Sequence, residues 1–337
     1  MTTMHAATEQ LENQKTNGIR RFDIGSDLRP VAELIADAFA VELDERGNAA
    51  LREMRIMSYV GGFLKLLNRT TGEFDDVFNG YVWVDEGRIV GNVTVQKADR
   101  HGSRWQIANV AVAPDCRGRG IARRLMAQAI GHIEDAGGKW AVLQVYEKNA
   151  AARNLYDTMS FEYVGGKSEL VLDQVPPLVT AGRIAHCYSF SANHWQELHQ
   201  LANNQLSSQA QWWRPLRSAE FQTPPDKQMS EWLWRTCGRR NIYRRAIQVT
   251  NRFEAALILK AERWSGRHEV QFYVRPENYG QYETDLLHWA LATLNDYPRW
   301  PVTASLTSDH AAALETFQRY GFRVERTLMT MRKKMIS

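Results

Sequence analysis

A glycine turn between an apolar strand and an amphipathic helix constrains this chain more than any other stretch. Residues 105–113 are apolar and β-branched enough for a buried strand, which Pro114 ends, and apolar residues recur at helical spacing from Ile121 onward. The turn between them reads RGRG. Backbone N–H groups at the start of a helix point toward one place, where the helix dipole adds partial positive charge. The sequence therefore predicts an anion site at this turn.

The residues of the turn favour a diphosphate as the anion. Gly118 and Gly120 remove side chains that would keep a phosphate away from the backbone, and Arg117 and Arg119 supply charge-assisted donors. Two other phosphate-binding turns fit poorly. The P-loop requires a lysine and a hydroxyl after its last glycine, and the dinucleotide fingerprint requires a third glycine where this chain has Arg123.

A second motif follows a second buried strand, residues 139–146. It has the spacing N-x-x-A-x-x-x-Y and a following phenylalanine, met here by Asn149, Ala152, Tyr156 and Phe161. The turn itself satisfies Q/R-x-x-G-x-G/A. With both motifs, residues 18–173 resemble the GCN5-related N-acetyltransferase (GNAT) superfamily. Ser160 departs from the family pattern, which has glycine there.

The resemblance implies that the turn holds the pyrophosphate of acetyl-CoA, which serves as a co-substrate without any metal. The pantetheine arm would then pair with backbone groups of alternate strand residues, as an added strand does. The residues expected to bind acetyl-CoA lie on the strand, in the turn and at the starts of two helices: Val110, Ala111, Val112, Arg117, Gly118, Arg119, Gly120, Ile121, Ala122, Arg123 and Asn149.

The resemblance also implies direct attack by an amine, with Tyr156 as the general acid for the departing CoA thiolate. A tyrosine that only packs against the co-substrate is the competing interpretation. A lysine-like amine must lose a proton before attack, at a cost of about 4 to 5 kcal/mol at pH 7. Many relatives have a carboxylate base on this strand, where the chain offers Gln106 and Asn109. Asp85, an acid of the loop at 42–45, or no residue at all could fill that role.

The second half of the chain repeats the first with its chemistry replaced. Aligned without gaps on the first turn, Tyr279, Tyr282 and Glu283 stand in place of arginine, glycine and isoleucine. Further on, His310 replaces the asparagine of the second motif and Phe317 replaces its tyrosine. We therefore expect a degenerate copy that does not bind acetyl-CoA and that shapes the acceptor pocket.

The predicted fold class is α/β, of the α+β type. It comprises two tandem GNAT-like domains, each a mixed, mostly antiparallel sheet flanked by helices. The expected boundaries are a flexible tail at 1–17, a catalytic domain at 18–173, a proline-containing linker at 174–181 and the degenerate domain at 182–337. Within the first domain, the pattern predicts helices at 27–40 and 50–67 and a hairpin at 81–96.

Composition bounds the location and the partners. The 337 residues carry a net charge of +4, contain no apolar run of 18 residues and have three cysteines without metal or redox spacing. We expect a cytoplasmic protein without a membrane partner or a metal. Arginines gather at 235–245, but the modest net charge favours a solvated hairpin face, so we do not expect nucleic acid as a partner. The sequence leaves the oligomeric state open.

These features predict an N-acetyltransferase that transfers acetyl from acetyl-CoA to a primary amine by direct attack. The acceptor is a small molecule or a peptide that the sequence does not identify. The alternative is a non-catalytic module that senses acyl-CoA and binds protein or RNA through its arginine-rich second half. The intact turn and Tyr156 favour the enzyme.

Overall fold

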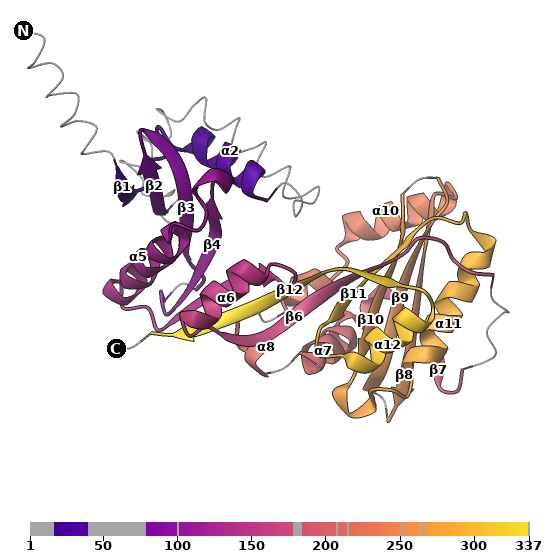
Figure 1. Cartoon of the computed structure of the whole chain (residues 1–337). Coiled ribbons are helices and arrows are strands. Elements are labelled where there is room, and N and C mark those ends of the chain that lie inside the picture. The colour runs from indigo at the N-terminus through magenta and orange to yellow at the C-terminus, as the bar shows by residue number, and fades with distance from the viewer. Residues whose placement is uncertain are drawn as a thin grey trace, which may run out of the picture. The chain divides into compact units, whose positions relative to one another are not determined.

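The computed structural model describes most of the chain and is drawn in Figure 1. The described residues are 17–39, 79–99, 101–177, 184–206, 208–213, 216–250, 252–264 and 266–335. Three predicted features lie outside them: the tail before residue 17, the acidic loop with the helix expected at 50–67, and residues 178–181 of the linker.

Strands and helices follow one another much as the sequence predicts. In the first half they are β1 (Gly18–Arg21), α2 (Leu28–Ala38), β2 (Gly80–Asp85), β3 (Arg88–Lys97), β4 (Arg104–Val112), the short 3-10 helix η1 (Pro114–Cys116), α5 (Ile121–Asp135), β5 (Trp140–Tyr146), α6 (Ala150–Thr158) and β6 (Glu162–Leu172). In the second half they are β7 (Cys187–Ser189), η2 (Ala192–His194), α7 (Trp195–Gln205), α8 (Ser208–Trp213), α9 (Ser218–Phe221), α10 (Pro225–Thr236), β8 (Arg240–Val249), β9 (Arg252–Glu262), β10 (His268–Val274), η3 (Pro276–Asn278), α11 (Glu283–Thr293), η4 (Leu294–Asp296), β11 (Val302–Thr307), α12 (Ala311–Arg319) and β12 (Arg323–Lys334).

The chain forms two compact units that each draw on separate segments. Unit 1 consists of Met1–Gln144, Leu155–Glu162 and Arg332–Ser337, and unit 2 of Val145–Asn154 and Tyr163–Met331. The bounds of these units differ from the predicted domains: residues 145–154 and 163–173 group with unit 2, and residues 332–337 with unit 1. The physical reason is strand pairing: β6 pairs antiparallel with β11 of unit 2 along most of its length.

Residues from the far end of the sequence are built into unit 1 by polar contacts. The Arg332 Nε atom donates to Glu162 Oε1 at 2.7 Å, and the Met335 N–H donates to the Lys139 carbonyl at 2.9 Å. Lys333 Nζ also donates to the Met159 carbonyl at 2.8 Å. These contacts complete unit 1 with a segment that follows unit 2 in sequence.

Unit 1 is a sheet in the order β1-β2-β3-β4-β5, with β2, β3 and β4 between α2 and α5 (Figure 1). All of its neighbouring pairs are antiparallel except β4 and β5, which are parallel. Helix α5 buries one apolar face on this sheet: Ile121, Leu125, Met126, Ala129 and Ile133. Gly91 lets the helix approach, because a Cβ there would lie 2.9 Å from the Ile121 and Leu125 side chains.

Strand β4 is irregular in two ways that matter for the site. Its register against β3 shifts: Thr94 pairs with Ala108 and Asn92 with Ala111, so one residue of β3 faces two residues of β4. Its parallel register with β5 covers only the residues from Arg104 to Ile107, although β4 continues to Val112. The far half of β4 therefore leaves one edge to other partners.

Unit 2 holds a sheet in the order β12-β6-β11-β10-β9-β8-β7. Its β10 and β11 are parallel, as β4 and β5 are in unit 1, and the pairs of β7, β8, β9 and β10 in series are antiparallel. Its largest core packs α11 and α12 against these strands, with Phe317 fully buried at the centre. The mixed sheets with flanking helices confirm the predicted fold class. In the described stretches, none of the helices combines the length and apolar character needed to cross a bilayer.

Candidate functional site

The glycine turn has the backbone geometry that the sequence predicts. Gly118 and Gly120 have φ values of 78° and 76°, in the left-handed region that favours glycine, and Gly120 is the N-cap of α5. A Cβ built on either glycine would meet no atom of the described residues within 4 Å, so these residues leave the space in front of the turn open. The first backbone hydrogen bond of α5 runs from Arg124 N–H to the Gly120 carbonyl at 3.1 Å. The preceding N–H groups of the helix are therefore not used within it, as an anion site requires.

Ion pairs hold the basic side chains around the turn. Arg119 Nη1 donates to Asp85 Oδ2 at 2.7 Å, and Arg88 forms a hydrogen-bonded ion pair with Asp115. That hydrogen bond from Arg88 is the main reason that the pKa of Asp115 is lowered. The two guanidinium groups also lie 3.6 Å and 3.7 Å from the sulfur of Cys116, which is buried. Ion pairs with Asp85 and Asp115 thus hold two arginines, Arg119 and Arg88, beside the turn.

The open edge of β4 ends at the turn. Ala113 N–H donates to the Val90 carbonyl in β3 at 2.9 Å, so the backbone groups of Val112 face the opposite edge, because successive residues of a strand alternate. On that edge the Val112 carbonyl accepts a hydrogen bond from Arg117 Nε at 3.2 Å. The structure thus gives Arg117 a partner that sequence reasoning did not foresee, and it leaves Val112 on the edge where a pantetheine amide was predicted to pair.

The remaining predicted binding residues have structural partners as well. Arg123 Nη2 donates to Thr158 Oγ1 at 2.7 Å, which joins α5 to the end of α6. Asn149 Oδ1 accepts from Ala152 N–H at 3.1 Å and so caps the start of α6. The binding of acetyl-CoA by these two residues stays a prediction.

Tyr156 lies on the buried side of α6. Its side chain is 5% exposed and its ring centre is 6.0 Å from that of Phe161. Packing of this kind fixes the direction of the ring, which both a general acid and a packing tyrosine require. The competing interpretations of Tyr156 therefore remain to be separated by experiment.

Asp85 is placed at the pyrophosphate end of the predicted site. It ends β2, pairs with Arg88 across the hairpin and holds Arg119 by the hydrogen bond described above. Asp85 thus has a structural partner beside the turn, and its role as a base stays a prediction. The acids of the loop at 42–45 lie outside the described residues.

The turn of unit 2 that corresponds to the glycine turn is closed by its own side chain. Glu283, 1% exposed, accepts hydrogen bonds from the N–H groups of Gly280 at 2.8 Å and Tyr282 at 3.0 Å. His310 lies 2.7 Å from the same carboxylate, and its ring stacks on Tyr279 at a centre distance of 3.7 Å. Burial would raise the pKa of Glu283, but the hydrogen bonds from His310 and Gly280 outweigh it and lower that pKa. A carboxylate thus sits where a phosphate would have to bind.

A sequence model of the Acetyltransferase (GNAT) family matches residues 48–161, which contain both motifs and the glycine turn. The fold of the whole chain is similar to that of a GCN5-related N-acetyltransferase from Sphaerobacter thermophilus, with a TM-score of 0.56, 14% identity and coverage of 95% of this chain and 96% of that one. It is also similar to a tandem GNAT protein from the clavulanic acid biosynthesis pathway, with a TM-score of 0.50, 14% identity and coverage of 95% and 98%. The chain contains a GNAT-family domain.

Curated relatives of this GNAT protein match part of it. It is 29% identical to mycothiol acetyltransferase of Thermobifida fusca over 168 residues, 47% of either chain. It is 30% identical to probable N-acetyltransferase family 8 member 5 of Mus musculus over 125 residues, 36% of this chain and 54% of that protein. The matches thus span about half the length of these relatives, and the fold similarity extends to a tandem GNAT protein.

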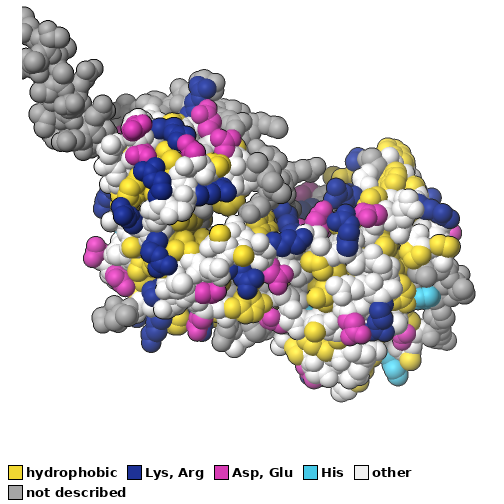
Figure 2. Space-filling view, viewed as in Figure 1, with side chains coloured by type: hydrophobic (Ala, Val, Ile, Leu, Met, Phe, Trp, Pro, Cys, Tyr) yellow, Lys and Arg dark blue, Asp and Glu magenta, His cyan; other side chains and the backbone are white. Residues whose placement is uncertain are grey.

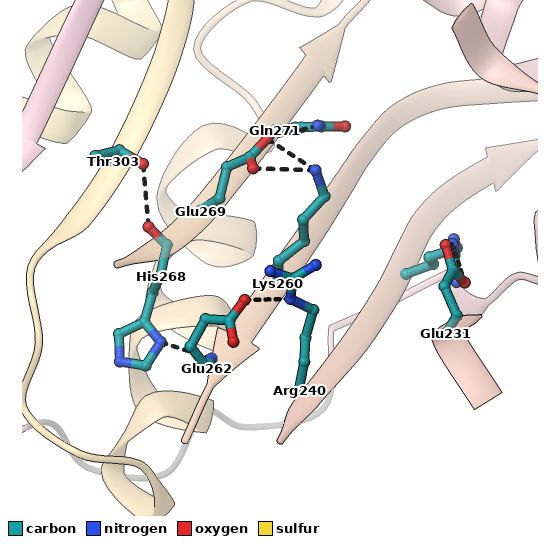
Figure 3. A network of polar contacts seen from close by, with 9 residues as sticks. Glu231, Arg240, Lys260, Glu262, His268, Glu269, Gln271 and Thr303 are labelled. Atoms are coloured by element: carbon teal, nitrogen blue, oxygen red, sulfur yellow. Dashed lines mark hydrogen bonds and ion pairs between the residues drawn. The ribbon is translucent and has the colours of Figure 1, made fainter. Parts of the chain in front are cut away.

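Among the described residues, acids pair with two of the five arginines in the arginine-rich segment of this GNAT protein. Within residues 235–245, Arg240 pairs with Glu262 and Arg244 with Glu231 at 3.0 Å. Figure 3 shows Arg240 in a network of polar contacts that spans β8, β9 and β10. On the face drawn in Figure 2, basic and acidic side chains are interspersed. The segment thus combines arginines that pair with an acid and arginines that pair with no acid in the described part of the chain, and the expectation that it does not bind nucleic acid stays a prediction.

Three polar residues lie near the bulge of β4: Asn92, Thr94 and Asn109. None of them was given a role from the sequence. Asn92 is 2% exposed and donates to the carbonyl of Asn109, whose side chain donates to Thr94 Oγ1 at 3.3 Å. These contacts connect neighbouring strands, so they do not show as a local pattern. The one signal available was an asparagine in a strand, since asparagine tolerates the left-handed conformation better than most residues.

Proposed function

We propose that this protein is an N-acetyltransferase that transfers acetyl from acetyl-CoA to a primary amine by direct attack. The observation that carries the proposal is the glycine turn: two left-handed glycines face open space at the start of α5. The same turn joins the edge of β4 that no strand among the described residues pairs with beyond Ile107. An extended molecule with a diphosphate at one end and amides along its length fits this combination.

The residues of the turn have the chemistry that acetyl-CoA requires. The backbone N–H groups at the start of α5 would bind the diphosphate, with Arg117 and Arg119 adding charge-assisted donors. Backbone groups of Val110 and Val112 would pair with the pantetheine amides as an added strand. When bound, acetyl-CoA supplies an activated acetyl thioester for attack by a nucleophile.

One residue of the chain is then proposed to supply the proton that the departing CoA sulfur needs. Tyr156 would donate a proton to the departing sulfur from a buried, oriented ring. The described strands offer neutral amides where other GNAT enzymes have a carboxylate, so the amine would enter in its neutral form or lose its proton to water. A small-molecule or peptide amine is the acceptor class that this chemistry supports.

Release of free CoA thiol tests the proposal directly. Acetyl-CoA is incubated with the protein and a panel of glucosamine, spermidine, a peptide with a free N-terminus and an N-terminally blocked lysine peptide. We expect thiol release above the hydrolysis background for at least one amine. Tight acetyl-CoA binding without release in the whole panel would contradict the enzyme and support the non-catalytic acyl-CoA module instead.

A further inference from the structure

Strand β4 contains a bulge whose strained residue is not a glycine. Asn109 has a φ of 51°, in the left-handed region, although it lies within a strand. The register shift leaves Asn109 and Val110 together opposite Val93 of β3. A left-handed residue other than glycine in a strand persists only when its surroundings hold it, and such residues gather at functional sites.

Two side-chain hydrogen bonds hold this bulge. The buried Asn92 donates its Nδ2 to the Asn109 carbonyl at 2.9 Å, which fixes the backbone. The Asn109 Nδ2 donates to Thr94 Oγ1 at 3.3 Å, which fixes the plane of the side-chain amide. The Asn109 side chain remains exposed, and among the described residues none donates to its Oδ1. An oriented acceptor atom is therefore presented to solvent.

The position of Asn109 relative to the acyl group follows from the proposed function, on which this inference rests. The diphosphate lies at the turn, and an arm with two amides that pair with alternate residues would use Val112 and then Val110. Those pairings occupy the open edge of β4 as far as the bulge. The end of the arm that carries the acetyl group would then reach Asn109.

We propose that Asn109 binds the acceptor amine, with its Oδ1 atom accepting a hydrogen bond from the amine N–H. This contact would turn the nitrogen lone pair toward the acetyl carbonyl carbon. An amide does not take a proton at neutral pH, so Asn109 positions the amine without deprotonating it. The site would therefore favour a primary amine that arrives already in its neutral form.

Asn109→Gly is the variant that isolates the side chain. Glycine adopts left-handed φ values freely, so the bulge keeps its backbone while Oδ1 and Nδ2 are lost. Thr250→Gly is the matched control, because Thr250 has a φ of 48° in the turn between β8 and β9 of unit 2. Asn109→Asp is the conservative variant, since aspartate keeps an oxygen acceptor and also tolerates this backbone conformation.

The readout is equilibrium binding of an amine to the protein saturated with CoA, measured by calorimetry. The probe is the panel amine that wild type acetylates fastest. We expect Asn109→Gly to weaken amine binding about tenfold, the effect of one lost hydrogen bond, and to leave CoA affinity unchanged. Thr250→Gly should bind both ligands like wild type, and Asn109→Asp should retain amine binding within a few-fold.

Two outcomes separate this inference from the proposed function. If folded Asn109→Gly has wild-type activity and unchanged amine binding, the role of Asn109 is overturned while the proposed function stands. Failure of wild type to release CoA with every panel amine would overturn the proposed function, and the role of Asn109 with it. A loss of CoA affinity in Asn109→Gly equal to its loss of amine affinity would also overturn the inference, because it would show a general disturbance of β4.

Discussion

Gly120 combines two properties that make it the most informative single position in the turn. Its φ of 76° strains any L residue, and a Cβ there would touch none of the residues that the structure describes. A substitution therefore changes what can approach the backbone more than it changes the packing. The strain is about 1 to 2 kcal/mol, which a folded domain of ordinary stability tolerates.

We expect Gly120→Glu to abolish acetyl-CoA binding without unfolding the protein, because it places bulk and negative charge where the diphosphate should bind. Calorimetric titration with acetyl-CoA measures the affinity, and circular dichroism checks the fold. Gly120→Ala is the control, since it carries the same backbone strain without the charge, and it should lose less affinity. Unchanged affinity in folded Gly120→Glu would remove the assignment of the turn.

Tyr156 is the residue for which the structure keeps two interpretations, and its substitution by phenylalanine separates them. Phenylalanine preserves the ring contact with Phe161 and removes only the hydroxyl. We expect Tyr156→Phe to lower kcat by about 10²-fold or more and to leave acetyl-CoA affinity nearly unchanged, as the loss of a general acid does.

Steady-state kinetics with the preferred panel amine measure this effect. Tyr188→Phe is the control, because Tyr188 is exposed on β7 and its hydroxyl has no proposed role. Wild-type turnover in Tyr156→Phe would reduce Tyr156 to a packing residue.

At the scale of elements, α5 and α11 begin in contrasting ways. Helix α5 starts behind an open glycine turn, whereas α11 starts with Glu283, which bonds to the N–H groups of its own turn. The Glu283 carboxylate thus places a negative charge at the start of α11, where the helix dipole favours one. At the start of α5 the proposed diphosphate would supply that charge. Because His310 and the backbone donors lower the pKa of Glu283, the carboxylate favours folding while it is ionised.

The sign of the pH effect follows from this lowered pKa. The stabilisation is present above the unfolded-state value of about 4.3 and is lost as the pH falls through the lower folded-state pKa. We expect Glu283→Gln to destabilise unit 2 by about 1 to 3 kcal/mol at pH 7, and the difference from wild type to shrink below pH 4.

Urea denaturation at both pH values measures this difference. Asp285→Asn is the matched control, because Asp285 lies in the first turn of the same helix but is exposed. If Glu283→Gln is as stable as wild type at pH 7, the Glu283 carboxylate does not stabilise unit 2.

The elements show what the sequence can and cannot predict. The turn, α5 and the hairpin of β2 and β3 were predictable, because glycine spacing and apolar periodicity are local properties. The bulge at Asn109 was not, because Asn92 and Thr94 act on it from the neighbouring strand. The replacement at Glu283 was visible in the sequence, but its hydrogen bonds to its own turn depend on backbone conformation and on His310, far along the chain.

At the scale of the whole molecule, the two turns predict the number of ligands that one chain binds. Unit 1 offers an open turn, and unit 2 fills the corresponding place with a buried carboxylate that would repel a diphosphate. We expect one acetyl-CoA per chain.

Calorimetric titration of the intact chain should therefore give a stoichiometry near one, and Gly120→Glu should reduce it to zero. Two equivalent sites in wild type would contradict the description of unit 2 as a degenerate copy. A single site that persists in folded Gly120→Glu would place the binding elsewhere.

The division of the chain into two units was the property of the whole molecule that was hardest to predict from the sequence. A linker at 174–181 was predicted from its prolines, which mark the end of a regular element but say nothing of which strands pair. The grouping of residues 163–173 with unit 2 depends on the register of β6 against β11, and residues far apart in sequence form that register.

The polar contacts of residues 332–335 affect the order in which the two units can complete their folds during synthesis. Unit 1 holds most of the earliest residues of the chain, yet Arg332 and Met335, which contact Glu162 and Lys139, leave the ribosome only after the whole of unit 2. Domains that form one continuous segment can fold in turn as they emerge. Here the nascent first unit must wait until residues 332–335 have been made to acquire its final strand segment, so the glycine turn belongs to a unit that is completed only after unit 2.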